Sequence, residues 1–144
     1  MFKAKDSMRK KIVMLKEEIH IYEAMNRLVE NQISGLPVVD NKENLVGILS
    51  EKDVLKLLAH EKIDQHDTVA KYMTKEVKSF APEDSVVDIC DFFIENPIRR
   101  IPIVEKGKLV GVIARRDIIC LILKLKGEEK RCRGHPTERE ERRF

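Results

Sequence analysis

Two carboxylates, Asp53 and Asp117, stand at equivalent places in the chain, each just after a short apolar run. Three residues before Asp53 lies Ser50, whose hydroxyl suits the N-cap of a helix. The positive end of a helix favours an anion, and a carboxylate one turn in lies on the same rim, where it accepts hydrogen bonds from a bound molecule. Ser-x-x-Asp is equally typical of a capping box that only stabilises the helix, so ligand binding and capping are both open at this point.

The segments that carry these carboxylates occur twice. Pro37 and Pro102 lie in similar β-branched runs, and Asp53 and Asp117 follow them at nearly the same interval. The second copy is shorter by a single residue, and this slip falls in the polar turn between the two motifs. A repeat of this length that is present twice indicates two similar units rather than a solenoid. Clefts between similar units are common ligand sites.

Each repeat is predicted to fold as strand, helix, strand, strand and helix, which gives an α/β (α+β) architecture. In the first repeat we expect a strand at 12–15, a helix at 19–31, a hairpin of 36–39 with 45–49, and a helix from Ser50 onward. In the second we expect a strand at 77–80, a helix at 85–95, a hairpin of 101–104 with 109–113, and a helix at 116–126. A single helical turn is predicted within 68–73. The domain prediction is therefore 1–64, 65–126 and a charged tail, 127–144.

Composition narrows the function classes. Hydrophobic residues make up 42% of the 144 residues and charged residues 37%, but the net charge is only +3, so no strong overall field attracts nucleic acid or a membrane. No apolar run approaches the ~20 residues of a membrane helix, and the start of the sequence has no apolar signal region. These features favour a cytoplasmic protein. The composition of the tail is typical of a mobile segment, or of a helix extension that is stabilised only by contact with a partner.

Three cysteines are present, and an odd number does not suggest a disulfide framework. Cys90 and Cys120 lie in apolar helical stretches and are expected to be small buried hydrophobes. Gly47 and Gly111 lie inside predicted strands, where close approach of another backbone is the common reason for glycine.

The motifs resemble those of cystathionine-β-synthase (CBS) domains, arranged as the tandem pair called a Bateman module. Residues 33–40 with 47–53, and 98–104 with 111–117, are similar to the two signatures of that family, and the resemblance covers roughly residues 8 to 125. It implies two β-α-β-β-α units with pseudo-twofold symmetry, frequently assembled as a disc-shaped homodimer. It also implies binding of AMP, ADP, ATP or S-adenosylmethionine in clefts between the repeats, and regulation of another protein rather than catalysis.

The resemblance also implies which residues form two crossed sites, in which a carboxylate accepts from the ribose diol and donors hold the phosphate. The first site would contain Ser50, Asp53, Thr74, Lys75, Val77, Ile98 and Arg99. The second would contain Ala114, Arg115, Asp117, Arg9, Lys10, Ile12, Ile33 and Ser34. Because Ala114 replaces the hydroxyl of Ser50, we expect the Asp53 site to be the better nucleotide site.

Two other functions remain open. The chain could be a structural or dimerisation module whose clefts are degenerate and bind nothing. It could also be an accessory protein that binds RNA or DNA through its tail, although the mixed charges of the tail argue for a solvated segment. An enzyme is the least favoured class, because the sequence offers no recognisable catalytic constellation. No metal site and no required cofactor are predicted.

Overall fold

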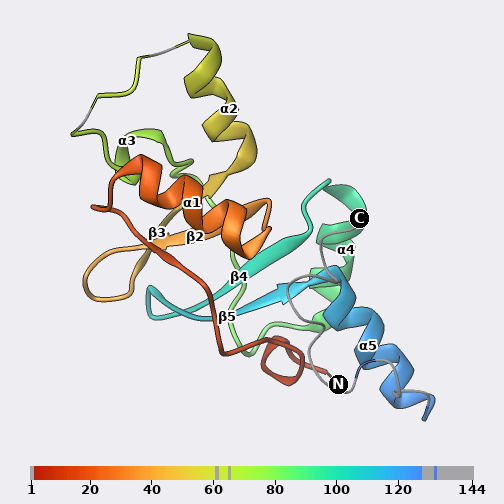
Figure 1. Cartoon of the computed structure of the whole chain (residues 1–144). Coiled ribbons are helices and arrows are strands. Elements are labelled where there is room, and N and C mark those ends of the chain that lie inside the picture. Colours follow the sequence, from red (N-terminus) through yellow and green to blue (C-terminus); the bar gives the residue numbers. More distant parts are fainter. Residues whose placement is uncertain (1, 61, 65, 128–131, 133–144) are drawn as a thin grey trace. The chain divides into compact units, whose positions relative to one another are not determined.

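The computed structural model describes residues 2–60, 62–64, 66–127 and 132 (Figure 1). These residues form two compact units. One unit holds Val13–Val77. The other, which we call the split unit, joins the N-terminal residues up to Ile12 to the chain from Lys78 onward. Each unit is described by itself.

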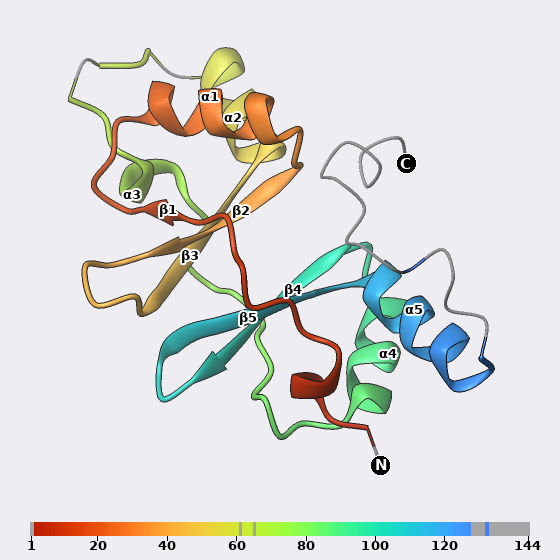
Figure 2. The same cartoon turned by 60° about the horizontal axis from the view of Figure 1, so that its bottom comes forward.

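The Val13–Val77 unit contains a small mixed sheet covered by helices. Its elements are β1 (Leu15–Lys16), α1 (Ile21–Asn31), β2 (Gly35–Val39), β3 (Leu45–Ser50), α2 (Glu51–His60) and α3 (Val69–Tyr72). The strand order is β1-β2-β3, with β1 parallel and β3 antiparallel to β2. Beyond β3, Thr74 forms a single antiparallel bridge with Ile48. Figure 2 shows α1 and α2 on the same side of this sheet.

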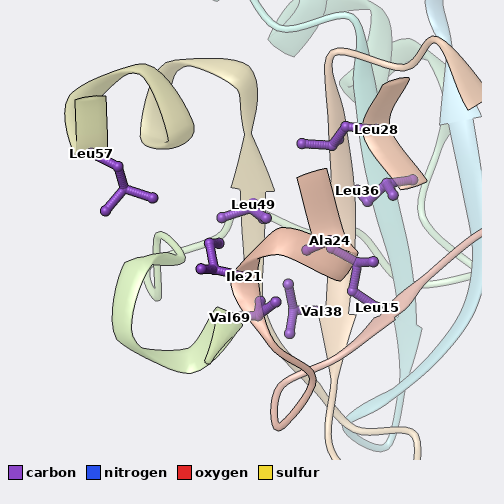
Figure 3. Packing of buried hydrophobic residues seen from close by; sticks show 9 residues of the cluster. All are labelled: Leu15, Ile21, Ala24, Leu28, Leu36, Val38, Leu49, Leu57 and Val69. Atoms are coloured by element: carbon purple, nitrogen blue, oxygen red, sulfur yellow. The ribbon is translucent and has the colours of Figure 1, made fainter. Parts of the chain in front are cut away.

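Strand alternation places the core of this unit on one face of the sheet. Leu36 and Leu49 are cross-strand neighbours, and both are buried. The apolar stripe of α1 packs onto them, and Leu57 of α2 belongs to the same cluster (Figure 3). The nine buried residues of the cluster are Leu15, Ile21, Ala24, Leu28, Leu36, Val38, Leu49, Leu57 and Val69. Each large aliphatic side chain buried in this way contributes about 1.5–3 kcal/mol.

The split unit repeats this arrangement with a segment taken from the start of the chain. Its elements are η1 (Ala4–Asp6), α4 (Val86–Glu95), β4 (Arg100–Glu105), β5 (Lys108–Ala114) and α5 (Arg115–Leu125). β4 and β5 are antiparallel, and single bridges add Phe80 beside β4 and Arg9 beside β5. Helices α4 and α5 cover one face of the hairpin through a core of Ala4, Val86, Ile89, Phe93, Ile101, Ile103, Ile113 and Ile118. Within the described ranges, the longest helices have 11 residues, well short of the ~20 that a bilayer span requires.

The structure confirms the predicted helices and both hairpins, as well as the helical turn at α3. The first strand of each repeat is shorter than predicted, and only the last residue of each predicted range pairs with the hairpin. Instead of strands at 12–15 and 77–80, β1 has two residues and the second repeat has only the bridge between Phe80 and Ile103. The chain passes from one unit to the other between Ile12 and Val13 and again between Val77 and Lys78. The residues around these two crossings therefore do not pair along the edge of either hairpin.

The compact units and the duplicated sequence divide the chain at different places. The residues up to Ile12 pack with the second half of the chain, and the stretch before Lys78 packs with the first half. The boundaries 1–64 and 65–126 therefore remain a proposal about the duplicated sequence. Most of the tail at 127–144, and with it the prediction of a mobile segment or helix extension, lies outside the described residues.

The cysteine prediction was wrong for Cys120. Its sulfur forms a disulfide with Cys132, 12 residues later, with a Cα–Cα distance of 5.8 Å. Cys120 is half-buried, and Cys90 is a free, half-buried thiol whose pKa is raised by burial. An odd number of cysteines excludes complete pairing but allows one bridge between the last helix and the residues that follow it.

This pairing predicts the alkylation pattern of the protein purified without reductant. After unfolding in iodoacetamide, we expect mass spectrometry to find label on Cys90 alone, and on all three cysteines after reduction. Cys132→Ser should free Cys120 and give two labelled residues without reductant. Label on all three wild-type cysteines before reduction would contradict the bridge.

The turn before α3 is fixed by Asp67, which is 7% exposed. Its carboxylate accepts hydrogen bonds from the main-chain N–H of Asp64 at 2.7 Å, from Lys71 Nζ at 3.0 Å and from the Tyr72 hydroxyl. These donors, with Tyr72 the largest cause, lower the pKa of Asp67 from 3.8 to about 2. The ionised carboxylate therefore stabilises the folded state.

We expect this stabilisation to depend on pH. Because the folded-state pKa lies below the ordinary value, the stabilisation is present above about pH 4 and is lost as pH falls towards about 2. In urea unfolding, Asp67→Asn should be less stable than wild type near neutral pH, and the difference should shrink through this window. Asp91→Asn removes an exposed carboxylate on α4 and serves as the control. A difference between Asp67→Asn and wild type that stays constant with pH would contradict the prediction.

Candidate functional site

The carboxylate of Asp53 joins the end of β3, the start of α2 and the segment after α3. Asp53 Oδ2 accepts from the main-chain N–H of Ser50 at 2.9 Å and from the Ser50 hydroxyl at 3.0 Å. The main-chain N–H of Asp53 lies 3.2 Å from Ser50 Oγ, which completes the predicted capping box. Asp53 Oδ1 accepts from the Thr74 hydroxyl at 3.1 Å. We call Ser50, Asp53 and Thr74 the Asp53 half-site.

Two features of the backbone place Thr74 beside this carboxylate. The main chains of Ile48 and Thr74 exchange two hydrogen bonds, of 2.9 and 2.8 Å. Gly47 lets the segment come this close, since a Cβ there would lie 2.7 Å from Met73 Sδ and 2.8 Å from the Thr74 carbonyl oxygen. This is the close backbone approach expected of Gly47. Asp53 is only 9% exposed, whereas Thr74 is exposed, so the half-site has a buried acceptor and an open rim.

The split unit builds an equivalent arrangement around Asp117. Asp117 Oδ2 accepts from the main-chain N–H of Ala114 at 2.7 Å at the start of α5. Asp117 Oδ1 accepts from Arg9 Nε at 2.8 Å, and this ion pair is largely buried, with 19% and 10% of the two side chains exposed. The main chains of Arg9 and Val112 exchange hydrogen bonds of 2.9 and 3.0 Å. We call Arg9, Ala114 and Asp117 the Asp117 half-site.

The residues before each proline strand lie beside the helix start of their own unit. In the Val13–Val77 unit, the carbonyl of Ser34 accepts from the N–H of Glu51 at 2.8 Å, with Ile33 just before it. In the split unit, the carbonyl of Arg99 accepts from the N–H of Arg115 at 3.0 Å. Ser34 and Arg99 are separated by the same interval as Pro37 and Pro102, and they thus hold equivalent positions.

The guanidinium of Arg115 makes its hydrogen bonds to main-chain carbonyl groups. Its Nε donates to the Ile98 carbonyl at 2.9 Å, and one terminal nitrogen donates to the carbonyls of Asn96 at 2.9 Å and Phe93 at 3.4 Å. The guanidinium also lies 5.9 Å from the ring centre of Phe93. Through these contacts, Arg115 fixes the turn between α4 and β4.

Four more of the predicted site residues follow Thr74 and Arg9 along the chain. Lys75 and Val77 come after Thr74, and Lys10 and Ile12 come after Arg9; both lysines are exposed. The predicted crossing assigns Ile98 and Arg99 to the Asp53 site, and Ile33 and Ser34 to the Asp117 site. Because these assignments combine residues of different units, they stay predictions.

Two methionines fill the cores, as expected of apolar side chains, but sequence reasoning missed which glycines they face. Met8 and Met73 are separated by the same interval as the two repeats, and each packs against the glycine of the neighbouring strand, Gly111 or Gly47. The sequence signal for this pairing is that the two methionines are spaced by the same interval as the repeats. Among the described residues, no group of three or more His, Cys, Asp or Glu side chains is placed to hold a metal ion.

The paired half-sites and the doubled hairpins agree with a comparison against known families. The model of the CBS domain matches residues 4–60 and 69–124. The chain belongs to the CBS domain family. An uncharacterized 17.7 kDa protein of Acidianus ambivalens is 34% identical over 114 residues, which are 78% of this chain and 68% of that protein. The protein MJ1225 of Methanocaldococcus jannaschii is 30% identical over 82% of this chain, which spans 42% of that relative.

Solved structures of CBS pairs support the same fold. The structure of CBSX2 in complex with AMP has a TM-score of 0.76 and 26% identity, and covers 88% of this chain and 99% of that one. The CBS domain pair of MJ0100, in complex with 5′-methylthioadenosine and S-adenosylmethionine, has a TM-score of 0.70 and 29% identity over 84% of this chain and 99% of that one. Tandem CBS pairs of this fold thus include proteins that bind adenosine compounds.

Some relatives are much longer enzymes. The inosine-5′-monophosphate dehydrogenase of Aquifex aeolicus is 37% identical over 109 residues, which are 74% of this chain but 22% of that enzyme. The matching part is therefore a minor portion of that enzyme.

Proposed function

We propose that this CBS pair is a regulatory module that binds an adenosine-containing ligand and passes its bound state to another protein. The observation that carries the proposal is the Asp53 half-site, where a largely buried carboxylate meets a hydroxyl from a segment 21 residues away at the start of a helix. Such a carboxylate is suited to accept from the two hydroxyls of a ribose.

Three features support an adenosine ligand over an unrelated one. The half-site motif occurs twice, once in each unit. Its residues match the motifs for which the family resemblance implies ribose contacts. Two of the similar solved structures contain AMP, or 5′-methylthioadenosine with S-adenosylmethionine. The assignment of AMP, ADP, ATP or S-adenosylmethionine to this chain remains the proposal.

The proposal is tested with the purified protein and four adenosine compounds. We expect at least one of 5′-methylthioadenosine, S-adenosylmethionine, AMP and ATP to raise the melting temperature and to give saturable heat in calorimetry. GTP at equal concentration is the control for general nucleotide binding. If none of the four compounds shifts the melting temperature or gives saturable heat, the alternative of a structural module with empty clefts is favoured instead.

We further propose a homodimer as the assembly that transmits the ligand state. Exposed apolar side chains on α5 support this, because Ile119, Ile122 and Leu125 are each more than half exposed. Differential affinity of the ligand for two arrangements of the dimer is what such a switch requires. Sedimentation with and without ligand measures the assembly. The regulated protein and the cytoplasmic location also belong to the proposal, and no catalytic step is assigned to the chain.

A further inference from the structure

Arg9 and Thr74 occupy the same place in the two units but have different chemistry. Each bridges the edge strand of its hairpin, and each donates to the carboxylate at the start of the following helix. Thr74 brings a neutral hydroxyl to Asp53, at 3.1 Å. Arg9 brings a guanidinium to Asp117, at 2.8 Å. The duplicated site therefore carries one more positive charge in the split unit.

Neighbouring residues increase this contrast. Around the Asp53 half-site, the first turn of α2 and the segment after Thr74 carry Glu51, Asp53 and Glu76 against Lys52 and Lys75, a net charge of −1. Around the Asp117 half-site, the first turn of α5 and the segment from Arg9 carry Arg9, Lys10, Lys11 and Arg116 against Asp117, a net charge of +3 when Arg115, which donates to the carbonyls of the preceding turn, is left out. The two half-sites thus differ by four charges.

The ion pair also changes what Asp117 can accept. A carboxylate that holds a guanidinium in a largely buried, charge-assisted hydrogen bond is a poorer acceptor for a sugar hydroxyl. A phosphate, in contrast, gains from the positive charge of the guanidinium and of the neighbouring cations. At the Asp53 half-site, the same phosphate would face an excess of negative charge.

We propose that the two half-sites select adenosine ligands by charge, and this rests on the function proposed above. The Asp117 half-site, through Arg9, takes a phosphate-bearing ligand such as ATP, which reverses the order of nucleotide affinity expected from the sequence. The Asp53 half-site, through Thr74, takes an uncharged adenosine compound such as 5′-methylthioadenosine. Arg9 is then the specificity-determining residue, and the module reads two chemically different ligands at once.

Calorimetry on the full chain tests this with ATP and 5′-methylthioadenosine as probes. In wild type, saturation with one probe should leave the affinity for the other unchanged. Arg9→Thr should lower the ATP affinity about tenfold without affecting 5′-methylthioadenosine. Thr74→Arg should weaken 5′-methylthioadenosine binding and leave ATP bound. Competition of the two probes for a single site would overturn the proposal.

Two further variants separate charge from folding. Arg9→Lys keeps the positive charge and should retain most of the ATP affinity, whereas a loss as large as that of Arg9→Thr would refute selection by charge. Lys108→Thr removes the same charge from the opposite end of β5 and should leave both affinities unchanged; an equal loss would show a general field effect rather than a role of Arg9. If neither probe binds wild type, it is the proposed function that fails.

Discussion

Replacement of Gly47 by alanine is expected to destabilise the Val13–Val77 unit by about 1–3 kcal/mol. The added Cβ would lie 2.7 Å from Met73 Sδ and 2.8 Å from the Thr74 carbonyl oxygen. The sulfur can move, but the carbonyl accepts from the Ile48 N–H at 2.9 Å, so its displacement breaks the bridge that holds Thr74 against β3. Urea unfolding of wild type and Gly47→Ala measures this cost.

Two other glycines provide graded controls for this variant. A Cβ at Gly35 would meet nothing closer than the Leu49 carbonyl oxygen at 3.4 Å, so Gly35→Ala should change stability by no more than about 0.5 kcal/mol. At Gly111 the close atoms all belong to the Met8 side chain, which can rotate, so Gly111→Ala should have an intermediate cost. If Gly47→Ala and Gly35→Ala prove equally stable, the close approach of the Thr74 segment is not what requires Gly47.

Local signals explain why the helix starts could be predicted. Ser50 and Asp53 are three residues apart, and their reciprocal capping is decided within one turn of helix. The turn before β3 is similarly local, because Asp40 Oδ1 accepts from the N–H groups of Lys42 and Asn44 at 2.8 and 3.0 Å. Such features depend on neighbours in the sequence and hardly at all on the rest of the fold.

The contacts that distinguish the two half-sites are not local. Arg9 reaches Asp117 across 108 residues of chain, and the sequence places the two residues in one site only through the family resemblance, because no pattern near either residue specifies the pairing. Likewise, the sequence presents Arg115 as a cation beside a candidate site, while the structure turns its guanidinium toward the carbonyls of Asn96 and Ile98. Residue type indicates the available chemistry, but only the packing of distant segments decides which partner each group has.

Loss of the Asp53 carboxylate is expected to lower the affinity for 5′-methylthioadenosine about ten- to hundredfold in Asp53→Ala. Two hydroxyls of a ribose would lose their charged acceptor, and Thr74 would lose the oxygen that orients its own hydroxyl. The same substitution removes the N3 partner of the α2 capping box and leaves the Ser50 hydroxyl as the cap, so it also lowers the stability of the helix start. Calorimetry at a temperature well below the unfolding transition measures the affinity.

Capping and ligand contact can be separated by removing a cap elsewhere. The Ser85 hydroxyl caps α4 by accepting from the Val87 N–H at 3.1 Å, so Ser85→Ala should lose a similar amount of stability while 5′-methylthioadenosine binds as in wild type. Because the Asp117 carboxylate is already paired with Arg9, Asp117→Ala should lower the affinity for this uncharged ligand much less than Asp53→Ala does. If Asp53→Ala loses stability but binds 5′-methylthioadenosine as tightly as Ser85→Ala does, Asp53 is a helix cap and nothing more.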